Sequence, residues 1–192
     1  MDAGQIKVFL DGATRYFVET VGSKAEVGSP YLIDDARSVA GEFTGAIGIS
    51  GRHRGTVYFT ADRALLMLLM KEVGEQNMTR ENMLDLVGDV ANTISGNARN
   101  HFGNDFMISV PTLIYGQDAL HLPKGIKSYA LPVVWKGYRA SVIGDRKPRL
   151  MLICGTRAAR LFLTAELQAD LTQVIHIARR SQQRAMGETG CC

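Results

Sequence analysis

Asp89 and Asn92, a carboxylate and a carboxamide three residues apart, lie in the middle of a helical pattern. Residues three apart are neighbours on the surface of an α-helix. A carboxylate accepts hydrogen bonds, whereas a carboxamide both donates and accepts them. Gly96, one turn further on, leaves room for the backbone of another molecule. The pattern predicts a face that is pressed against a partner, and the alternative interpretation is a plain solvated face.

The helix that positions these residues is predicted over Arg80–Phe102, with the hydroxyl of Thr79 available at its amino terminus. At about 100° per residue, its apolar residues fall in one sector that faces the core. That sector contains Leu84, Val87, Ala91, Ile94 and Ala98. The opposite sector contains Asp85, Asp89, Asn92 and Gly96.

Three further helices are predicted from apolar spacing and from capping residues. They are Asp2–Val21, Ala61–Val73 introduced by Thr60, and Ala165–Ala185 introduced by Thr164. Extended segments are predicted at Ala25–Ile33, Ser38–Ile49, Gly55–Phe59, Met107–Tyr115, Lys127–Trp135, and as a hairpin of Tyr138–Ile143 with Arg149–Cys154. Gly45 and Gly48 fall in one of these strands, where a side chain would crowd a neighbour.

No linker or low-complexity stretch divides the chain, so the order of elements favours one α/β domain of the α+β type. We expect residues 1–160 to form this domain, with a mixed or antiparallel sheet, two central helices and an N-terminal helix. Residues 161–192 are expected to add a C-terminal helix and tail that pack on the same domain or extend it.

Composition excludes several classes of protein. The 192 residues are 46% hydrophobic and 21% charged, which is typical of a globular domain. The net charge of +3 comes without a long basic run, so nucleic acid is not an expected partner. The apolar cluster Ala64–Met70 is far shorter than the roughly 20 residues of a membrane span. Three cysteines and an acidic start favour the cytoplasm over export.

The residues that commonly bind metals are scattered. His53, His101, His121 and His176 have no partner at metal-ligand spacing, and Cys154 stands alone in an apolar run. Gly45-x-x-Gly48-x-x-Gly51 lacks the tight turn of a nucleotide-binding loop. We therefore expect neither a metal site nor a cofactor of the chain's own.

The run Val87–Ala98 resembles the signature helix of CheX-type proteins in the CheC/CheX family of chemotaxis phosphatases, where Glu-x-x-Asn is followed by Gly-Asn-Ala. Other blocks agree in the same order. They are Val8–Val21 leading to Gly28–Tyr31, Ile47–Gly51, Arg54–Val57 and Ser109–Thr112. The resemblance covers about Ile6 to Cys154, which makes it more specific than one short motif.

The resemblance implies a mechanism and a set of roles. Members of this family dephosphorylate the response regulator CheY by docking the signature helix over its aspartyl phosphate. By that likeness Asn92 orients the attacking water and Asp89 holds the helix on a lysine of the regulator. Neighbouring residues of the same helix would contact the partner: Asp85, Gly88, Gly96 and Arg99. Mg²⁺ would belong to the regulator, and CheX-type proteins pair through their sheets, so a homodimer is expected.

One departure from the family pattern leaves alternatives open. Asp89 stands where the family has Glu and is one methylene shorter. The first alternative to a phosphatase is an adaptor that binds a regulator without hydrolysing its phosphate. The second is a purely structural dimerisation partner.

Overall fold

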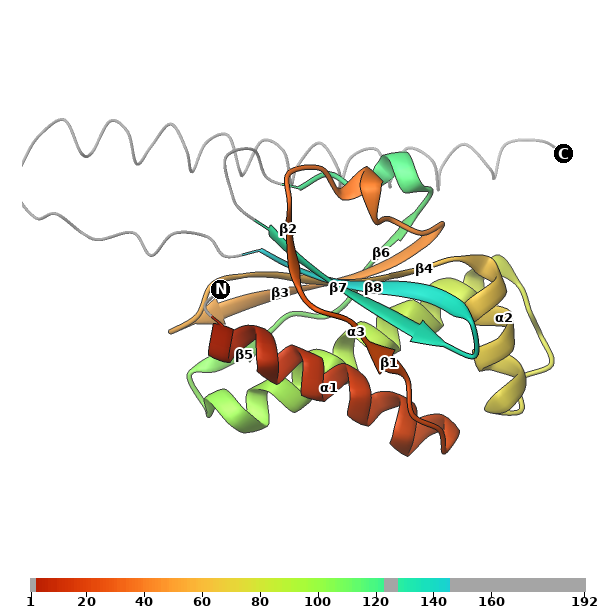
Figure 1. Cartoon of the computed structure of the whole chain (residues 1–192), viewed down its shortest axis with the longest axis horizontal. Coiled ribbons are helices and arrows are strands. Elements are labelled where there is room, and N and C mark those ends of the chain that lie inside the picture. Colours follow the sequence, from red (N-terminus) through yellow and green to blue (C-terminus); the bar gives the residue numbers. More distant parts are fainter. Residues whose placement is uncertain (1–2, 123–127, 146–192) are drawn as a thin grey trace, which may run out of the picture. The chain divides into compact units, whose positions relative to one another are not determined.

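The computed structural model describes residues 3–122 and 128–145 (Figure 1). The helices are α1 (Ala3–Val21), α2 (Arg63–Glu72) and α3 (Arg80–Phe102), with two short 3-10 helices, η1 (Ala36–Ser38) and η2 (Gln117–Ala119). The strands are β1 (Glu26–Val27), β2 (Tyr31–Ile33), β3 (Phe43–Gly51), β4 (Gly55–Ala61), β5 (Phe106–Ile108), β6 (Thr112–Tyr115), β7 (Ser128–Trp135) and β8 (Tyr138–Asp145). The predicted boundary near residue 160 and the helix Ala165–Ala185 lie outside the described residues.

The strands form one eight-stranded sheet in which every pair is antiparallel, in the order β1-β7-β8-β4-β3-β5. The two remaining strands, β2 and β6, lie at the edges of the sheet. Strand β2 pairs with β7, and β6 pairs with β3. The long strand β3 therefore has β4 on one side and both β5 and β6 on the other. The expectation of an α+β domain with an antiparallel sheet is confirmed.

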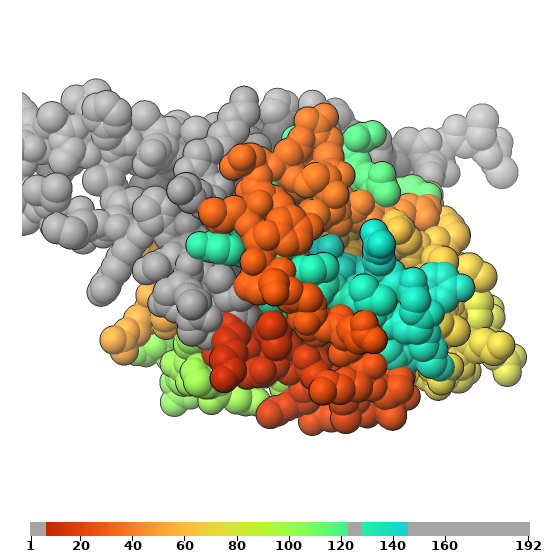
Figure 2. Space-filling model, in the orientation of Figure 1, coloured from red at the N-terminus to blue at the C-terminus, as the bar shows by residue number. Residues whose placement is uncertain are grey.

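The two faces of the sheet are covered differently. All three α-helices lie on one face, where their apolar side chains join those of the strands in the main core (Figure 1). The other face is covered by irregular segments around η1 and η2, in a smaller cluster that includes Ala36, Leu120 and Tyr58. Figure 2 shows the segment from β2 to η1, in orange, on the opposite side from α1, in red. This arrangement leaves the outer surfaces of α1 and α3 free of other described elements.

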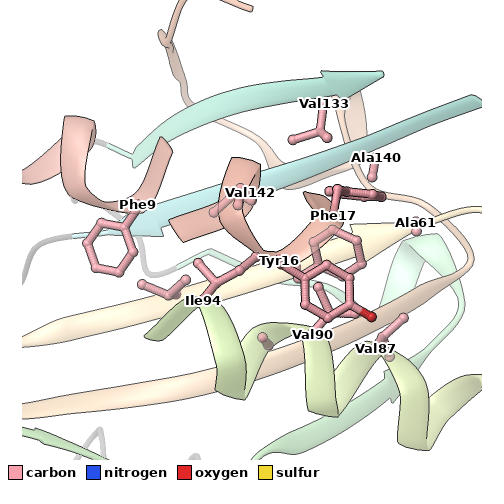
Figure 3. Packing of buried hydrophobic residues seen from close by; sticks show 14 of the residues in the cluster. Phe9, Tyr16, Phe17, Ala61, Val87, Val90, Ile94, Val133, Ala140 and Val142 are labelled. Carbon is pink, nitrogen blue, oxygen red and sulfur yellow. The ribbon is translucent and has the colours of Figure 1, made fainter. Parts of the chain in front are cut away.

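Helix α1 packs against both α3 and the sheet (Figure 3). Phe17 is fully buried, and its ring centroid lies 5.6 Å from that of Trp135 on β7. The indole Nε1 of Trp135 donates to Ser23 Oγ at 2.8 Å, which ties the end of α1 to the sheet. Gly12 allows α1 to approach α3 closely, because a Cβ there would lie 3.1 Å from the carbonyl oxygen of Ile94. Helix α1 is thus tied to the sheet near its end and packs closely against α3 at Gly12.

Thr60 does not cap a helix, and this prediction was wrong. It is buried in β4, where its hydroxyl oxygen accepts from the backbone N–H of Gly41 and from Thr44 Oγ, both at 2.8 Å. Helix α2 starts three residues later and has Asp62 at its N-cap position. A hydroxyl that satisfies two buried donors stabilises the strand more than it would an exposed helix start.

Two predicted strands are each divided in the structure. The segment Ala25–Ile33 forms β1 and β2 around Gly28-Ser29-Pro30, and Met107–Tyr115 forms β5 and β6 around Pro111. Proline has no N–H for the ladder, so it interrupts pairing at an edge.

The hairpin also differs from the expectation. Strand β8 pairs with β7, through a turn in which Lys136 and Gly137 have positive φ, and with β4. The other predicted arm, Arg149–Cys154, lies outside the described residues.

Candidate functional site

Helix α3 has the predicted bounds, Arg80–Phe102, and the predicted cap. Thr79 Oγ1 accepts from the backbone N–H of Asn82 at 3.2 Å, which satisfies one of the free donors at the helix start. The helix ends at Gly103, whose φ of 82° suits glycine and whose N–H donates to the carbonyl of Arg99. A capped helix of 23 residues is a rigid support for the side chains along it.

The buried and exposed faces of α3 follow the apolar spacing. The residues Val87, Ala91, Ile94 and Ala98 are fully buried, and Leu84 is half-buried. Asp85, Asp89 and Asn92 are exposed, as predicted. We call these three residues the α3 ridge. The helix thus presents two carboxylates and one carboxamide to the surroundings.

The ridge side chains have no hydrogen-bond or ion-pair partners within the part of the chain that the structure describes. Among the described residues, neither Asp89 nor Asn92 makes a side-chain hydrogen bond or an ion pair. The two are separated by about 4.5 Å along the helix axis, at 1.5 Å per residue. Their donors and acceptors are therefore available in full to a molecule that approaches from outside.

The two aspartates of the α3 ridge slightly destabilise the helix that carries them. Asp85 and Asp89 are four residues apart and both exposed, and such like-charge pairs destabilise a helix by about 0.2–0.5 kcal/mol. No basic side chain forms an ion pair with either of them within residues 3–122 and 128–145. Folding alone does not account for two unpaired acids at this spacing.

Gly96 and Arg99 extend the ridge toward the end of α3. Arg99 is exposed in the last turn, where positive charge is favoured by the helix dipole. Gly96 is half-buried, and a Cβ at this position would have no atom within 4 Å in the described part of the chain. Since glycine inside a helix costs about 0.5–1 kcal/mol relative to alanine, internal packing gives no reason for it.

Gly88 is placed differently from the expectation that it contacts a partner. It is buried, and a Cβ there would lie 2.7 Å from Leu113 Cδ2 and 3.3 Å from Pro111 Cβ. The absence of a side chain lets the edge of the sheet approach α3. Gly88 is therefore a packing residue, and Pro111 and Leu113 cover it at this point of the helix.

A second glycine, Gly45 on β3, lets α3 rest directly on the sheet. A Cβ at Gly45 would lie 2.3 Å from the carbonyl oxygen of Val87 and 2.9 Å from the backbone nitrogen of Gly88. The crowding expected at Gly45 from the sequence is therefore confirmed. Because Val87 and Gly88 immediately precede Asp89, this contact sets the height of the ridge above the sheet.

Tyr16 of α1 lies near Asp89 of the α3 ridge, and the sequence analysis did not identify this residue. Its ring is buried against α3 next to Val90 (Figure 3). Burial raises the pKa of Tyr16 to about 12, and the negative charge of Asp89 adds to the shift. The phenol is thus neutral at neutral pH. The sequence places Tyr16 one helical turn after Gly12, but it does not show that this side of the helix faces α3.

Two other kinds of site are not found in the described part of the chain. There, no three or more His, Cys, Asp or Glu side chains gather closely enough to hold a metal ion. No described helix combines the length and the apolar character that crossing a bilayer requires.

Known proteins resemble this chain in sequence and in structure. Residues 43–133 match the family model described as chemotaxis phosphatase CheX, a range that includes all of α3 and the ridge. No curated protein sequence matches the chain. The structural neighbours below are less than 25% identical in sequence, so they bear on the fold alone.

Three solved structures illustrate that fold. A CheC-like superfamily protein from Shewanella sp. PV-4 has a TM-score of 0.67 at 22% identity and covers 77% of this chain and 99% of its own. The chemotaxis protein CheX from Vibrio vulnificus has a TM-score of 0.65 at 21% identity, with 76% and 100% covered. A chain of the CheX–CheY–BeF3–Mg²⁺ complex from Borrelia burgdorferi has a TM-score of 0.60 at 23% identity, with 74% and 98% covered. The predicted resemblance is confirmed: residues 43–133 match the CheX family of chemotaxis phosphatases, and the described domain has the CheC-like fold.

Proposed function

We propose that this chain removes the phosphoryl group from the aspartyl phosphate of a CheY-like response regulator. The observation that carries the proposal is the exposed pair Asp89 and Asn92. The pair has no hydrogen-bond or ion-pair partner among the described residues, and it lies on a rigid helix inside the segment matched by the CheX family. The Borrelia burgdorferi complex of CheX with CheY adds support for the class of partner.

In this reaction the oxygen of a water molecule attacks phosphorus as the bond to the regulator's aspartate breaks. The products are a free aspartate carboxylate and inorganic phosphate, which takes up the protons of the water. Phosphoryl transfer needs mainly an in-line nucleophile and compensation of charge. The carboxamide of Asn92 orients the water by accepting from its O–H group and does not compete as a base.

Asp89 has the role of holding α3 on its partner through a basic group beside the phosphoryl group. The carboxylate is exposed and unpaired within the described residues, so it is ready for such a contact. Charge compensation at the phosphoryl group would come from Mg²⁺ bound by the regulator, and the chain needs no cofactor of its own. Asp85 and Arg99 extend the contact along the helix.

The test is a phosphate-release assay with the full chain and each response regulator of its genome, phosphorylated with acetyl phosphate and freed of excess reagent. We expect substoichiometric amounts of the chain to accelerate release from one regulator. Tight binding with unchanged decay would favour the adaptor. The adaptor is the second candidate because Asp89 is shorter than the family's Glu.

Two further predictions belong to the same proposal. The protein is located in the cytoplasm, and it forms a homodimer.

Replacing Asp89 by glutamate is expected to raise kcat/KM by about tenfold. The longer side chain restores the reach of the family residue, and a misplacement of about 1 Å can cost on the order of 10²-fold in rate. The control is Asp118→Glu, the same change at an exposed residue of η2 on the other side of the sheet. A loss of activity in Asp89→Glu would mean that the surface is fitted to a partner that needs the shorter acid.

Replacing Gly96 by alanine is expected to change stability and binding in opposite directions. The methyl group meets no described atom within 4 Å and improves helix propensity, so the free energy of unfolding should rise by about 0.5–1 kcal/mol. Binding to the regulator should weaken, because the partner loses the space that the glycine leaves. Urea denaturation and titration with beryllofluoride-loaded regulator measure the two effects.

The contrasting variant is Gly12→Ala, whose Cβ would lie 3.1 Å from the carbonyl oxygen of Ile94 on the buried side of α3. It should lower stability and leave the contact surface unchanged. If Gly96→Ala binds the regulator as tightly as the wild type, the partner does not approach α3 closely at this turn.

A further inference from the structure

An apolar ledge projects from the sheet edge beside α3. It consists of the segment Ser109–Leu113, between β5 and β6, and we call it the edge ledge. Val110 is 82% exposed, the highest value among the large apolar side chains of the described residues. Leu113 is 41% exposed, and Met107 just before the ledge is 52% exposed. Three exposed apolar side chains thus lie close together in the sequence at one edge.

The edge ledge is held in place by hydrogen bonds to β3. The backbone N–H of Ser109 donates to the carbonyl of Gly48 at 2.9 Å, and the N–H of Gly48 donates to Ser109 Oγ at the same distance. Ser109 Oγ in turn donates to the carbonyl of Val110 at 2.8 Å. Pro111 limits the backbone further. The exposure of Val110 is therefore a property of an ordered segment.

The edge ledge adjoins the α3 ridge. Pro111 and Leu113 pack over Gly88, which immediately precedes Asp89 and lies about one helical turn before Asn92. No residue from Met107 to Leu113 carries a charge. Two residues of the uncharged edge ledge therefore lie beside the turn of α3 that leads into Asp89. Protein interfaces combine an apolar centre with a polar rim in a similar way.

We propose that the edge ledge is the apolar part of the surface that binds the response regulator, with Val110 as its main contact. This inference rests on the proposed function, because the regulator is the molecule placed over Asp89 and Asn92. The edge ledge lies beside the α3 ridge, so a molecule bound over Asp89 and Asn92 would also reach the ledge. This favours the regulator over a second copy of the chain as the molecule bound there. Val110 touches the partner both before and during hydrolysis, so it affects binding and leaves the chemical step alone.

The experiment compares Val110→Ser with wild-type protein, using the regulator loaded with beryllofluoride for binding and the phosphorylated regulator for kinetics. We expect Kd and KM to rise about tenfold, as for the loss of one buried aliphatic contact, with kcat unchanged. The control is Leu32→Ser on β2 at the opposite edge of the sheet, where the side chain is 52% exposed. It should bind as tightly as the wild type.

The outcomes separate the two proposals. If Val110→Ser binds normally while Asn92→Ala loses hydrolysis, the ledge proposal is wrong and the phosphatase proposal stands. If Val110→Ser instead loses self-association in sedimentation experiments without a change in Kd, the ledge joins copies of this chain, which also overturns the proposal. If the wild-type chain neither binds nor acts on any regulator, the proposed function fails, and the ledge proposal fails with it.

Discussion

Asn92→Ala is expected to lower the phosphate release stimulated by this chain by on the order of 10²-fold or more, the range found when one positioned hydrogen-bonding group is lost. The methyl group that remains has neither donor nor acceptor for the attacking water. Binding to the beryllofluoride-loaded regulator should change far less, because Asp89 and its neighbours stay in place. The measurements are single-turnover phosphate release and the Kd of the complex.

The folded state should tolerate this change. Asn92 is exposed and has no side-chain partner among the described residues, so the free energy of unfolding should stay within about 0.5 kcal/mol of the wild type. Asn100→Ala is a matched control, since Asn100 is also exposed on α3 but lies two turns further on. If Asn92→Ala retained full activity, the water would have to be oriented by another group.

Gly45→Ala is expected to destabilise the domain by about 3 kcal/mol, at the upper end of the cost of overpacking. The added Cβ would lie 2.3 Å from the carbonyl oxygen of Val87, and backbone atoms cannot turn aside as a flexible side chain can. Either the strand or α3 has to move. For a domain of this size the melting temperature should fall by about 10 °C. Thermal denaturation followed by circular dichroism checks it.

The same variant should also impair hydrolysis, because any shift of α3 at Val87 and Gly88 moves the ridge relative to the edge ledge. Gly48→Ala is the matched control, three residues along the same strand. Its Cβ would lie 3.4 Å from Ser109 Oγ, an ordinary contact, so its cost should be less than about 1 kcal/mol. Equal stability of the two variants would contradict the close contact between α3 and β3.

The features of the site that are local in sequence were predictable. The bounds of α3, its cap at Thr79 and its exposed residues follow from helical spacing and capping, which depend on residues a few positions apart. The family resemblance rests on the same local runs. Gly45 was recognised as a crowded position, although its contact, the backbone at Val87, becomes visible only in the structure.

Features that depend on neighbours distant in the chain were not predictable. Thr60 has a suitable type for a helix cap, but its hydroxyl is taken by Gly41 and Thr44 in the assembled sheet. Gly88 was expected to face a partner because it shares a helix with Asp89, yet Pro111 and Leu113 cover it from the sheet edge. The types of the neighbouring residues do not reveal which strand a residue pairs with or which distant segment covers it.

Asp89 and Asn92 have no hydrogen-bond or ion-pair partners in residues 3–122 and 128–145, and this has a consequence for how such a protein diverges. If the proposed function is right, substitutions at these positions should alter recognition and catalysis with little effect on folding, since no described hydrogen bond or ion pair depends on them. A duplicated gene could therefore be redirected to a new regulator through a few changes on α3 while the scaffold stays intact. Screens that select only for stability or expression would not detect the loss of activity.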